Sequence, residues 1–95
     1  MEQPFEICIL SPRDVGPMRG VLAMFARAFE SPGQYLNSPP SDSYLKDLLQ
    51  KPHVIAVTAL SGGAVAGGLV AYQLDKFEQD RREIYIYDLA VDEPF

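Results

Sequence analysis

Apolar residues along the chain fall into two patterns, one typical of strands and the other typical of helices. Short runs rich in β-branched and aromatic residues, bounded by turn formers, cover residues 5–10, 53–60, 64–74 and 83–91 and predict four strands. Over residues 17–30 and 42–51, apolar residues instead recur at three- and four-residue steps, which predicts two amphipathic helices. The predicted order is therefore one strand, two helices and three further strands.

Proline and small polar residues set the expected ends of the helices. Pro17 has no N–H to donate and clashes with a preceding helical turn, so we expect a loose turn over 11–16 and a helix from about Pro17. The turn-rich residues 31–40 are expected to form a loop, after which Ser41 is a good N-cap for the second helix. The apolar stripe of the first helix is expected in the core and includes Met18, Phe25 and Phe29.

Short connections join the last three predicted strands, so we expect them to form an antiparallel meander. Ser61-Gly62-Gly63 is typical of a hairpin turn, and residues 75–82 form a charged connection. Gly67-Gly68, in the middle of the third strand, indicates a bulge or the close approach of another backbone. The fold class is therefore α+β, with both helices packed on an antiparallel sheet because their apolar stripes need a surface to cover.

Length and charge narrow the functions that the chain can have. Its 95 residues suffice for a single small domain over 1–95. Eight Lys and Arg against thirteen Asp and Glu give a net charge of −5, which argues against a nucleic-acid partner and favours a cationic ligand. No apolar stretch is long enough for a membrane helix, and the N-terminus does not resemble a signal peptide. With one cysteine, Cys8, and one histidine, His53, we expect no disulfide, no metal site and a cytoplasmic location.

One acidic residue, Asp88, interrupts an otherwise apolar strand near the C-terminus. A carboxylate at such a position needs a partner, because burying an unpaired charge is costly. Two interpretations are open: Asp88 has a functional role, or it is hydrogen-bonded to loop backbone. In a regular strand Glu83, Tyr85 and Tyr87 lie on the face opposite to Asp88, although a bulge would change this alternation.

The segment KFEQDRREIYIYDLAV, residues 76–91, resembles the corresponding stretch of the aminoglycoside 3-N-acetyltransferases, which are bacterial resistance enzymes of the GNAT superfamily. Residues 41–49 resemble the second helix of that family, and residues 64–72 resemble its third strand. The resemblance extends from about Phe5 to Val91. It implies the GNAT (acyl-CoA N-acyltransferase) fold, of which this chain would form the N-terminal half.

This resemblance implies transfer of an acetyl group from acetyl-CoA to the 3-amino group of an aminoglycoside such as gentamicin, by direct attack of the neutral amine on the thioester. It places Asp88 at the antibiotic site, as our candidate catalytic residue, which would bind the cationic amine or draw a proton from it, directly or through water. For the two strand tyrosines, packing on the sheet is the plainer alternative. The candidate substrate-binding residues are Asp88, Glu83, Tyr85, Tyr87 and Tyr35. The main-chain groups expected to meet the pantetheine arm of the cofactor are those of Leu89, Ala90 and Val91.

Members of the family bind the CoA pyrophosphate with an (Arg/Gln)-x-x-Gly-x-(Gly/Ala) loop after the fourth strand. The sequence ends at Asp92-Glu93-Pro94-Phe95, where this loop would begin, so we expect a domain truncated before the loop and a chain that is inactive alone. The alternatives are a non-catalytic fragment that binds polyamine-like cations and a dimerisation unit. We also expect the outer edge of the strand 83–91 to pair with a second copy, giving a homo-oligomer.

Overall fold

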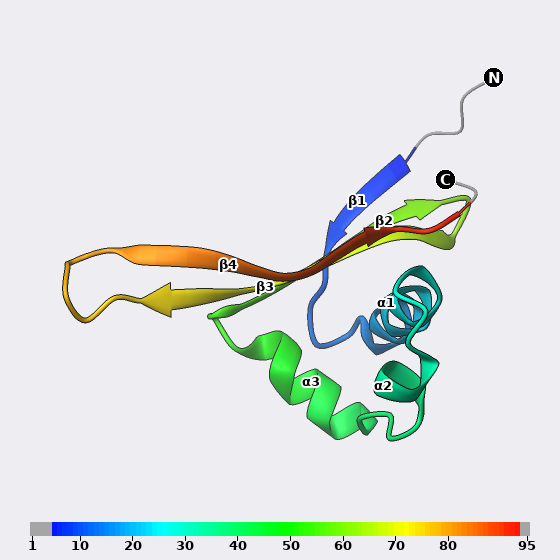
Figure 1. Ribbon diagram of the computed structural model, residues 1–95, viewed down its shortest axis with the longest axis horizontal. Helices are drawn as coiled ribbons and strands as arrows, with labels where there is room; N and C mark the ends of the chain where they lie inside the picture. The colour runs from blue at the N-terminus through cyan, green and yellow to red at the C-terminus, as the bar shows by residue number, and fades with distance from the viewer. Residues whose placement is uncertain (1–4, 94–95) are drawn as a thin grey trace.

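The computed structural model describes residues 5–93, in which four strands form a single antiparallel sheet with neighbours in the order β1-β2-β3-β4. Three helices lie against one face of this sheet (Figure 1). The α+β class and the antiparallel meander are therefore confirmed. The elements in chain order are β1 (Phe5–Ile9), α1 (Val15–Ala28), α2 (Pro32–Leu36), α3 (Asp42–Gln50), β2 (Val54–Ser61), β3 (Ala64–Asp75) and β4 (Arg82–Val91).

Helix α1 begins at Val15, two residues earlier than we expected from Pro17. The N–H groups of a first helical turn have no partner within the helix, so a proline there costs no hydrogen bond. Asp14 precedes the helix, and its carboxylate accepts from the Ser11 N–H at 2.8 Å and from the Ser11 hydroxyl at 2.9 Å. These two bonds hold the pKa of Asp14 below its usual value and fix the turn that leads into α1.

The region expected to be a loop, 31–40, contains the short helix α2, so that prediction is wrong in part. Ser31 precedes α2 and Pro32 starts it, in keeping with the preference of proline for the first turn of a helix. The N-cap expected at Ser41 is confirmed, because its hydroxyl accepts a hydrogen bond from the Tyr44 N–H at 3.1 Å.

The core lies between α1 and the middle of the sheet. A Cβ atom added to Gly68 of β3 would lie 2.9 Å from Val21 Cγ1, so glycine allows α1 to approach β3 this closely. Phe29, expected in the core, is instead 38% exposed because it lies at the end of α1, beyond the sheet-facing stripe. The large buried side chains at the centre are Phe25, Met24, Leu45 and Val21.

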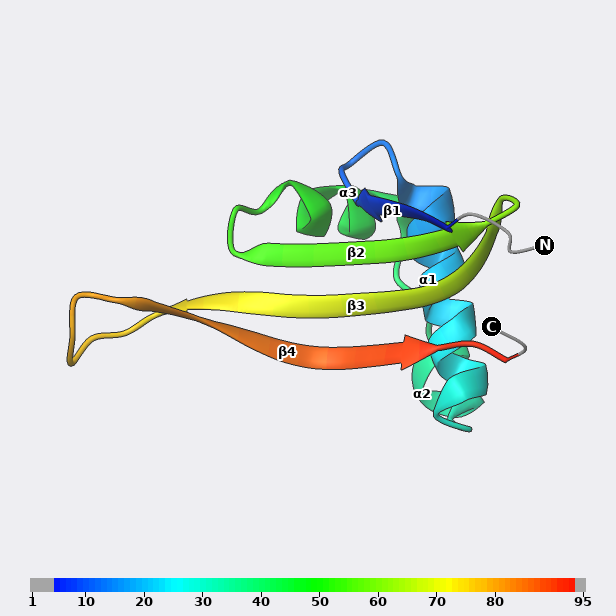
Figure 2. The same ribbon diagram turned by 90° about the horizontal axis from the view of Figure 1, so that it is seen from above.

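Two hairpins join the last three strands. Gly62 and Gly63 have φ angles of 58° and 85°, the left-handed conformation that a two-residue hairpin turn requires. The bulge expected around Gly67-Gly68 is confirmed beside these glycines. Ala59 of β2 pairs with Gly67, but the next residue, Leu60, pairs with Val65, so the register of the β2–β3 pair shifts by one residue at this point. The hairpin of β3 and β4 extends well past the helices (Figure 2), and the molecule measures 48 × 34 × 26 Å.

None of the described helices combines the length and the apolar character that crossing a membrane requires.

Candidate functional site

Asp88 lies in β4 opposite Val70 of β3, which is a buried member of the core, so its side chain is on the face of the sheet that the helices cover. The carboxylate is half-buried. The Tyr35 hydroxyl of α2 donates a hydrogen bond to Asp88 Oδ2 at 3.0 Å. Helix α2 lies on the helix side of the sheet, at some distance from the strands (Figure 1), and in the view from above it falls near the C-terminal end of β4 (Figure 2). Helix α2, which we had expected to be a loop, thus supplies the partner of the carboxylate.

A bulge in β4 changes which side chains accompany Asp88. Val70 pairs with Asp88 but the next residue of β3, Ala71, pairs with Ile86, which leaves Tyr87 as an extra residue. The alternation of a regular strand, which would put Tyr87 opposite to Asp88, is therefore wrong beyond this point. Tyr87 meets the ring of Tyr72 in β3 edge-on, with centroids 5.9 Å apart.

The same bulge determines the face of the sheet on which Tyr85 lies. It pairs with Tyr72 across the β3–β4 ladder, and directly opposed residues of antiparallel strands share a face. Because Tyr72 packs against the core on the helix side, the bulge brings Tyr85, Tyr87 and Asp88 to one face. Tyr85 and Tyr87 are 58% and 63% exposed, so their rings are open to a ligand.

Tyr35 is held by rings of α1. Its ring centroid is 5.9 Å from that of Phe25 and 6.1 Å from that of Phe29. Burial raises the pKa of Tyr35, and its hydrogen bond to Asp88 and the charge of that carboxylate raise the pKa further. At neutral pH the Tyr35 hydroxyl therefore stays protonated and donates a hydrogen bond to one oxygen of Asp88. The other carboxylate oxygen remains able to accept a hydrogen bond from a ligand.

One tyrosine that the sequence analysis did not select, Tyr72, also belongs to this region. Burial raises the pKa of Tyr72, and the neighbouring Tyr44, Tyr87 and Asp88 add to this effect. Tyr72 follows the buried Val70 by two residues in β3, so strand alternation from a core position was the signal that could have identified it. We name Tyr35, Tyr72, Tyr87 and Asp88 the tyrosine–aspartate cluster.

Asp88 differs from the other partly buried acids in its partner. Within residues 5–93, each of the others has a cation or a serine beside it, whereas Asp88 is bonded to a tyrosine hydroxyl. A half-buried carboxylate with no cationic partner in the described part of the chain is a favourable place for an ammonium group. The partners of the other three are Ser11 for Asp14, Arg81 for Glu83 and Arg27 for Asp92.

Glu83 lies near the tip of the β3–β4 hairpin, away from the cluster. Its carboxylate is 2.6 Å from the Arg81 guanidinium and 3.7 Å from the Lys76 ammonium. These two cations balance its charge, so it is less able to attract a cationic substrate than Asp88 is. A substrate contact of Glu83 stays a prediction.

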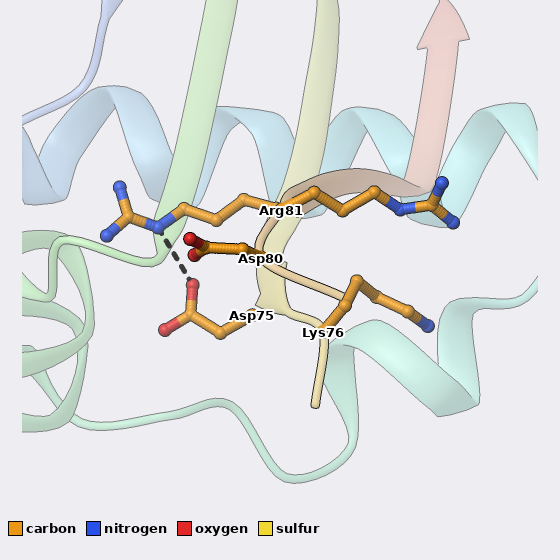
Figure 3. A pocket seen from close by; sticks show the side chains of 5 residues that line it. Asp75, Lys76, Asp80 and Arg81 are labelled. Atoms are coloured by element: carbon orange, nitrogen blue, oxygen red, sulfur yellow. Dashed lines mark hydrogen bonds and ion pairs between the residues drawn. The ribbon is translucent and has the colours of Figure 1, made fainter. Parts of the chain in front are cut away.

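Three hollows in the described residues are lined mainly by polar and charged side chains and are open to solvent. One of about 470 Å³ is lined by Asp75, Lys76, Asp80, Arg81 and Arg82, and an Arg82–Asp75 pair at 3.0 Å crosses it (Figure 3). It lies at the hairpin tip and does not include Asp88. Its lining has three cations and two acids, of which Arg82 and Asp75 pair with each other. The other two cations, Lys76 and Arg81, lie beside Glu83, so little unpaired charge remains to select a ligand.

Leu89, Ala90 and Val91 follow Asp88 at the end of β4. They pair with Leu69, Gly68 and Gly67 of β3 on one side, and in the described residues no strand adjoins β4 on its other side. Main-chain groups on such an edge can pair with an extended ligand that carries amide groups. The pantetheine arm of acetyl-CoA has two amides, so these residues fit the cofactor that the sequence implied.

Cys8 and His53 do not contribute to the cluster. Cys8 is a free, half-buried thiol in β1, and His53 is exposed before β2. Among the described residues, no three His, Cys, Asp or Glu side chains are grouped closely enough to hold a metal ion.

No protein-family model and no curated protein sequence matches the chain. Solved structures do match it. One aminoglycoside acetyltransferase from an uncultured soil metagenomic sample has 44% identity and a TM-score of 0.91, over 95% of this chain and 59% of its own. A second from such a sample, solved in complex with sisomicin, has 29% identity and a TM-score of 0.83, over 94% of this chain and 57% of its own.

A more distant structure is the ribosomal-protein-alanine N-acetyltransferase of Brucella melitensis biovar Abortus 2308. It has 24% identity and a TM-score of 0.68, and the alignment covers 97% of this chain and 60% of that protein. The chain thus spans about three fifths of the length of the structures it matches. The expected fold is confirmed: the sheet and helices have the GNAT acetyltransferase fold.

Proposed function

We propose that this chain forms the antibiotic-binding part of an aminoglycoside N-acetyltransferase that uses acetyl-CoA and modifies the 3-amino group. The observation that carries the proposal is Asp88, a half-buried carboxylate bonded to Tyr35 and surrounded by tyrosines. The 44% identity to a soil aminoglycoside acetyltransferase supports the substrate class. It does not favour the alternative of a non-catalytic fragment that binds cations or dimerises.

In the proposed reaction, the tyrosine–aspartate cluster binds one ammonium group of the drug. The Asp88 oxygen that Tyr35 leaves free accepts a hydrogen bond from this group and then removes its proton, giving the neutral amine that can act as a nucleophile. Acetyl-CoA, when bound, supplies the acetyl group as a thioester. In a direct attack by the neutral amine, the new amide C–N bond would form as the thioester C–S bond broke, and the CoA thiolate would leave with the proton that the nitrogen loses. No side chain would then need to carry the acetyl group.

The tyrosines are proposed to orient the drug. The exposed ring of Tyr87 lies edge-on to Tyr72 and so leaves a face available to a cation. Contacts of this type contribute about 0.5–2 kcal/mol, depending on how far the ammonium is shielded from water. Tyr85, next along the same face, is proposed to extend this contact to a second sugar ring, because an aminoglycoside carries several rings with amino groups.

Main-chain groups of residues 89–91 are proposed to hold the cofactor. They lie one to three residues beyond Asp88, so an acyl group bound there would be close to the amine that Asp88 holds. A location in the cytoplasm and pairing of the β4 edge with a second copy also stay predictions. The second is supported by the place of β4 at the end of the sheet order among residues 5–93, because a strand in that place can accept another strand.

Calorimetric titration with sisomicin or gentamicin tests the role of Asp88. We expect saturable binding, and a loss of at least about tenfold in affinity for Asp88→Asn, because a hydrogen bond to a charged group contributes about 1.5–3 kcal/mol. Asp80→Asn is the matched control: Asp80 is an exposed acid of the β3–β4 connection, and its change alters the net charge equally. Equal losses in both variants would indicate general attraction only and would contradict the proposal.

A further inference from the structure

Two tyrosines reach the region of the tyrosine–aspartate cluster from the helices rather than from the sheet. Tyr35 of α2 donates a hydrogen bond to Asp88 at 3.0 Å. The pKa of Tyr72 is raised by burial and then by Tyr44, which lies in the first turn of α3. Both helices lie on the same side of the sheet (Figure 1), and a short loop joins them. The position of this loop therefore affects where two tyrosines lie.

Helix α2 is too short to fix its own position. It has five residues, whereas an isolated helix needs about 12–15 residues to be even marginally stable in water. Before α2, the Ser31 N–H donates to the Ala26 carbonyl of α1 at 3.0 Å, and two phenylalanine rings of α1 lie against Tyr35. Residues 37–41, which follow α2, belong to no helix or strand. This end of the segment therefore depends on a contact from elsewhere in the fold.

Arg19 of α1 supplies that contact. Its guanidinium donates through Nη2 to the Pro40 carbonyl oxygen at 2.9 Å. It also donates to Asp42 Oδ1, at 2.5 Å from Nη2 and at 3.2 Å from Nε. The hydrogen bond from Arg19 and then its charge hold the pKa of Asp42 below the usual value. Arg19 thus joins α1 both to the main chain of the loop and to the first residue of α3.

The bond to a main-chain carbonyl distinguishes Arg19 from three other arginines of the described chain. The ion pairs of Arg27, Arg81 and Arg82 join side chains to side chains. Such exposed pairs contribute little by themselves, because water and salt screen them. A planar guanidinium with several donors can instead bind a carbonyl and a carboxylate at once, in a fixed geometry. Arg19 therefore restricts the path of the main chain between α2 and α3.

We propose that Arg19 is a positioning residue of the drug site: by holding the loop between α2 and α3, it keeps Tyr35 bonded to Asp88. Helix α1 then holds the segment at both ends, through Ala26 before α2 and through Arg19 after it. Tyr44, on the other side of the loop, depends on the same contact. The expected effect on drug binding rests on the proposed function, whereas the expected effect on Tyr35 does not.

The charge of Arg19 makes the expected change in binding easy to recognise. Replacing Arg19 by a neutral residue makes the net charge of −5 more negative by one unit, and general attraction would then strengthen the binding of a cationic drug. Loss of the tyrosine arrangement would weaken it. If this arrangement is present for about a fifth of the time, the apparent affinity falls about fivefold. The direction of the change therefore separates positioning from attraction.

Calorimetric titration with sisomicin measures this direction. We expect Arg19→Gln to bind about fivefold more weakly than the unmodified chain. Arg19→Lys keeps the charge but not the planar group, so it should recover only part of the affinity. The matched control is Arg82→Gln, which removes the same charge and the ion pair with Asp75 at the hairpin tip. It should bind sisomicin as tightly as the unmodified chain, or slightly more tightly. Circular dichroism should show that all three variants are folded.

The ionisation of Tyr35 provides a measurement that needs no drug. In Arg19→Gln the pKa of Tyr35, followed by NMR, should fall toward 10.0, because Tyr35 is less buried and spends less time bonded to Asp88. In Arg82→Gln it should stay as in the unmodified chain. An unchanged Tyr35 pKa in Arg19→Gln, or an equal fall in both variants, would overturn the proposal.

The two measurements also separate this proposal from the proposed function. If the unmodified chain binds sisomicin and Arg19→Gln binds it equally well or more tightly, the positioning role of Arg19 is wrong and the proposed function stands. If the unmodified chain does not bind sisomicin, the proposed function fails, and the Tyr35 measurement alone decides whether Arg19 positions Tyr35.

Discussion

The two faces of the sheet meet very different surroundings, although the same strands form both. On the helix side, Phe25 is 1% exposed, and polar groups such as Asp88 and Thr58 have specific hydrogen-bond partners. On the open face, the face of the sheet that the helices leave uncovered, Ile9 is 76% exposed, although isoleucine is one of the most apolar residue types. The helix side is therefore packed and supplies the candidate chemistry, whereas the open face leaves large aliphatic side chains exposed.

The distribution of polar and apolar residues over the two faces of β4 is thus the reverse of that expected for a sheet with one face in water. An antiparallel sheet with one covered face normally carries polar residues on the other. Here β4 places Asp88 and the tyrosines toward the helices and Ile84, Ile86 and Leu89 away from them. A small protein that leaves such side chains in water loses the stabilisation of their burial, about 25 cal/mol for each Å².

The comparison predicts its largest effect for a truncation in the helix-side core. We expect Phe25→Ala to lower the free energy of unfolding by about 3–5 kcal/mol, because it leaves a cavity beneath the sheet. Ile84→Ala, on the open face, should change it by no more than about 0.5 kcal/mol in the monomer, because Ile84 is 63% exposed. Urea denaturation at low protein concentration measures both, and similar losses would contradict the distinction between the faces.

A smaller effect is expected where α1 approaches β3. Gly68→Ala should lower the free energy of unfolding by about 1–3 kcal/mol, because the new methyl group would lie 2.9 Å from Val21, a stiff β-branched side chain. Gly16→Ala in α1 is the control, since a Cβ atom there meets nothing within 4 Å. It should leave stability unchanged or raise it slightly. Thermal unfolding checks both, and a neutral Gly68→Ala would show that α1 can shift.

The smallest effect concerns the hydrogen bond between Tyr35 and Asp88. The folded-state pKa of Tyr35 lies above its ordinary value of 10.0, first because of burial and then because of Asp88. In Asp88→Asn it should fall toward 10.0 without reaching it, because burial remains. NMR of ring-labelled tyrosine follows this titration, with Tyr85 in the same spectrum as an internal control. An unchanged Tyr35 pKa would mean that the bond to Asp88 does not form in solution.

The same shift sets a pH dependence of stability. Because folding raises the pKa of Tyr35, its contribution to stability is fully present below about pH 10. It is lost as the pH rises through the higher folded-state pKa. Tyr35→Phe cannot ionise at this position, so urea denaturation above pH 10 should show a smaller alkaline loss of stability than in the unmodified chain, with the part due to Tyr72 remaining.

Local sequence signals predicted most of the strands, because each strand is bounded by residues that act within a few positions. The pair Gly62-Gly63 identifies its hairpin without any knowledge of the rest of the fold. The start of α1 was misplaced because a proline acts differently in the first turn of a helix and in its interior, and the sequence does not say which applies. Helix α2 was missed because Ser31-Pro32-Gly33 has the composition of a turn.

The candidate site was predictable in part. Asp88 stood out because an acid in an apolar strand needs a partner, but the identity of that partner, Tyr35, depends on a contact 53 residues away along the chain. The position of the bulge, and therefore the face of Tyr87, depends on how β4 pairs with β3. No single-strand pattern contains that information. Tyr72 was missed for the same reason, since its role arises from its neighbours in space.

The extra residue in β4 has a consequence for how this strand can change over evolutionary time. Residues before Tyr87 and residues after it follow opposite phases of the strand alternation, so an odd-numbered position faces the helices on one side of it and solvent on the other. Selection for a different ligand can therefore change the residues before Tyr87, while the residues after Tyr87 keep their own alternation between the two faces. One inserted amino acid lets two halves of a strand diversify separately.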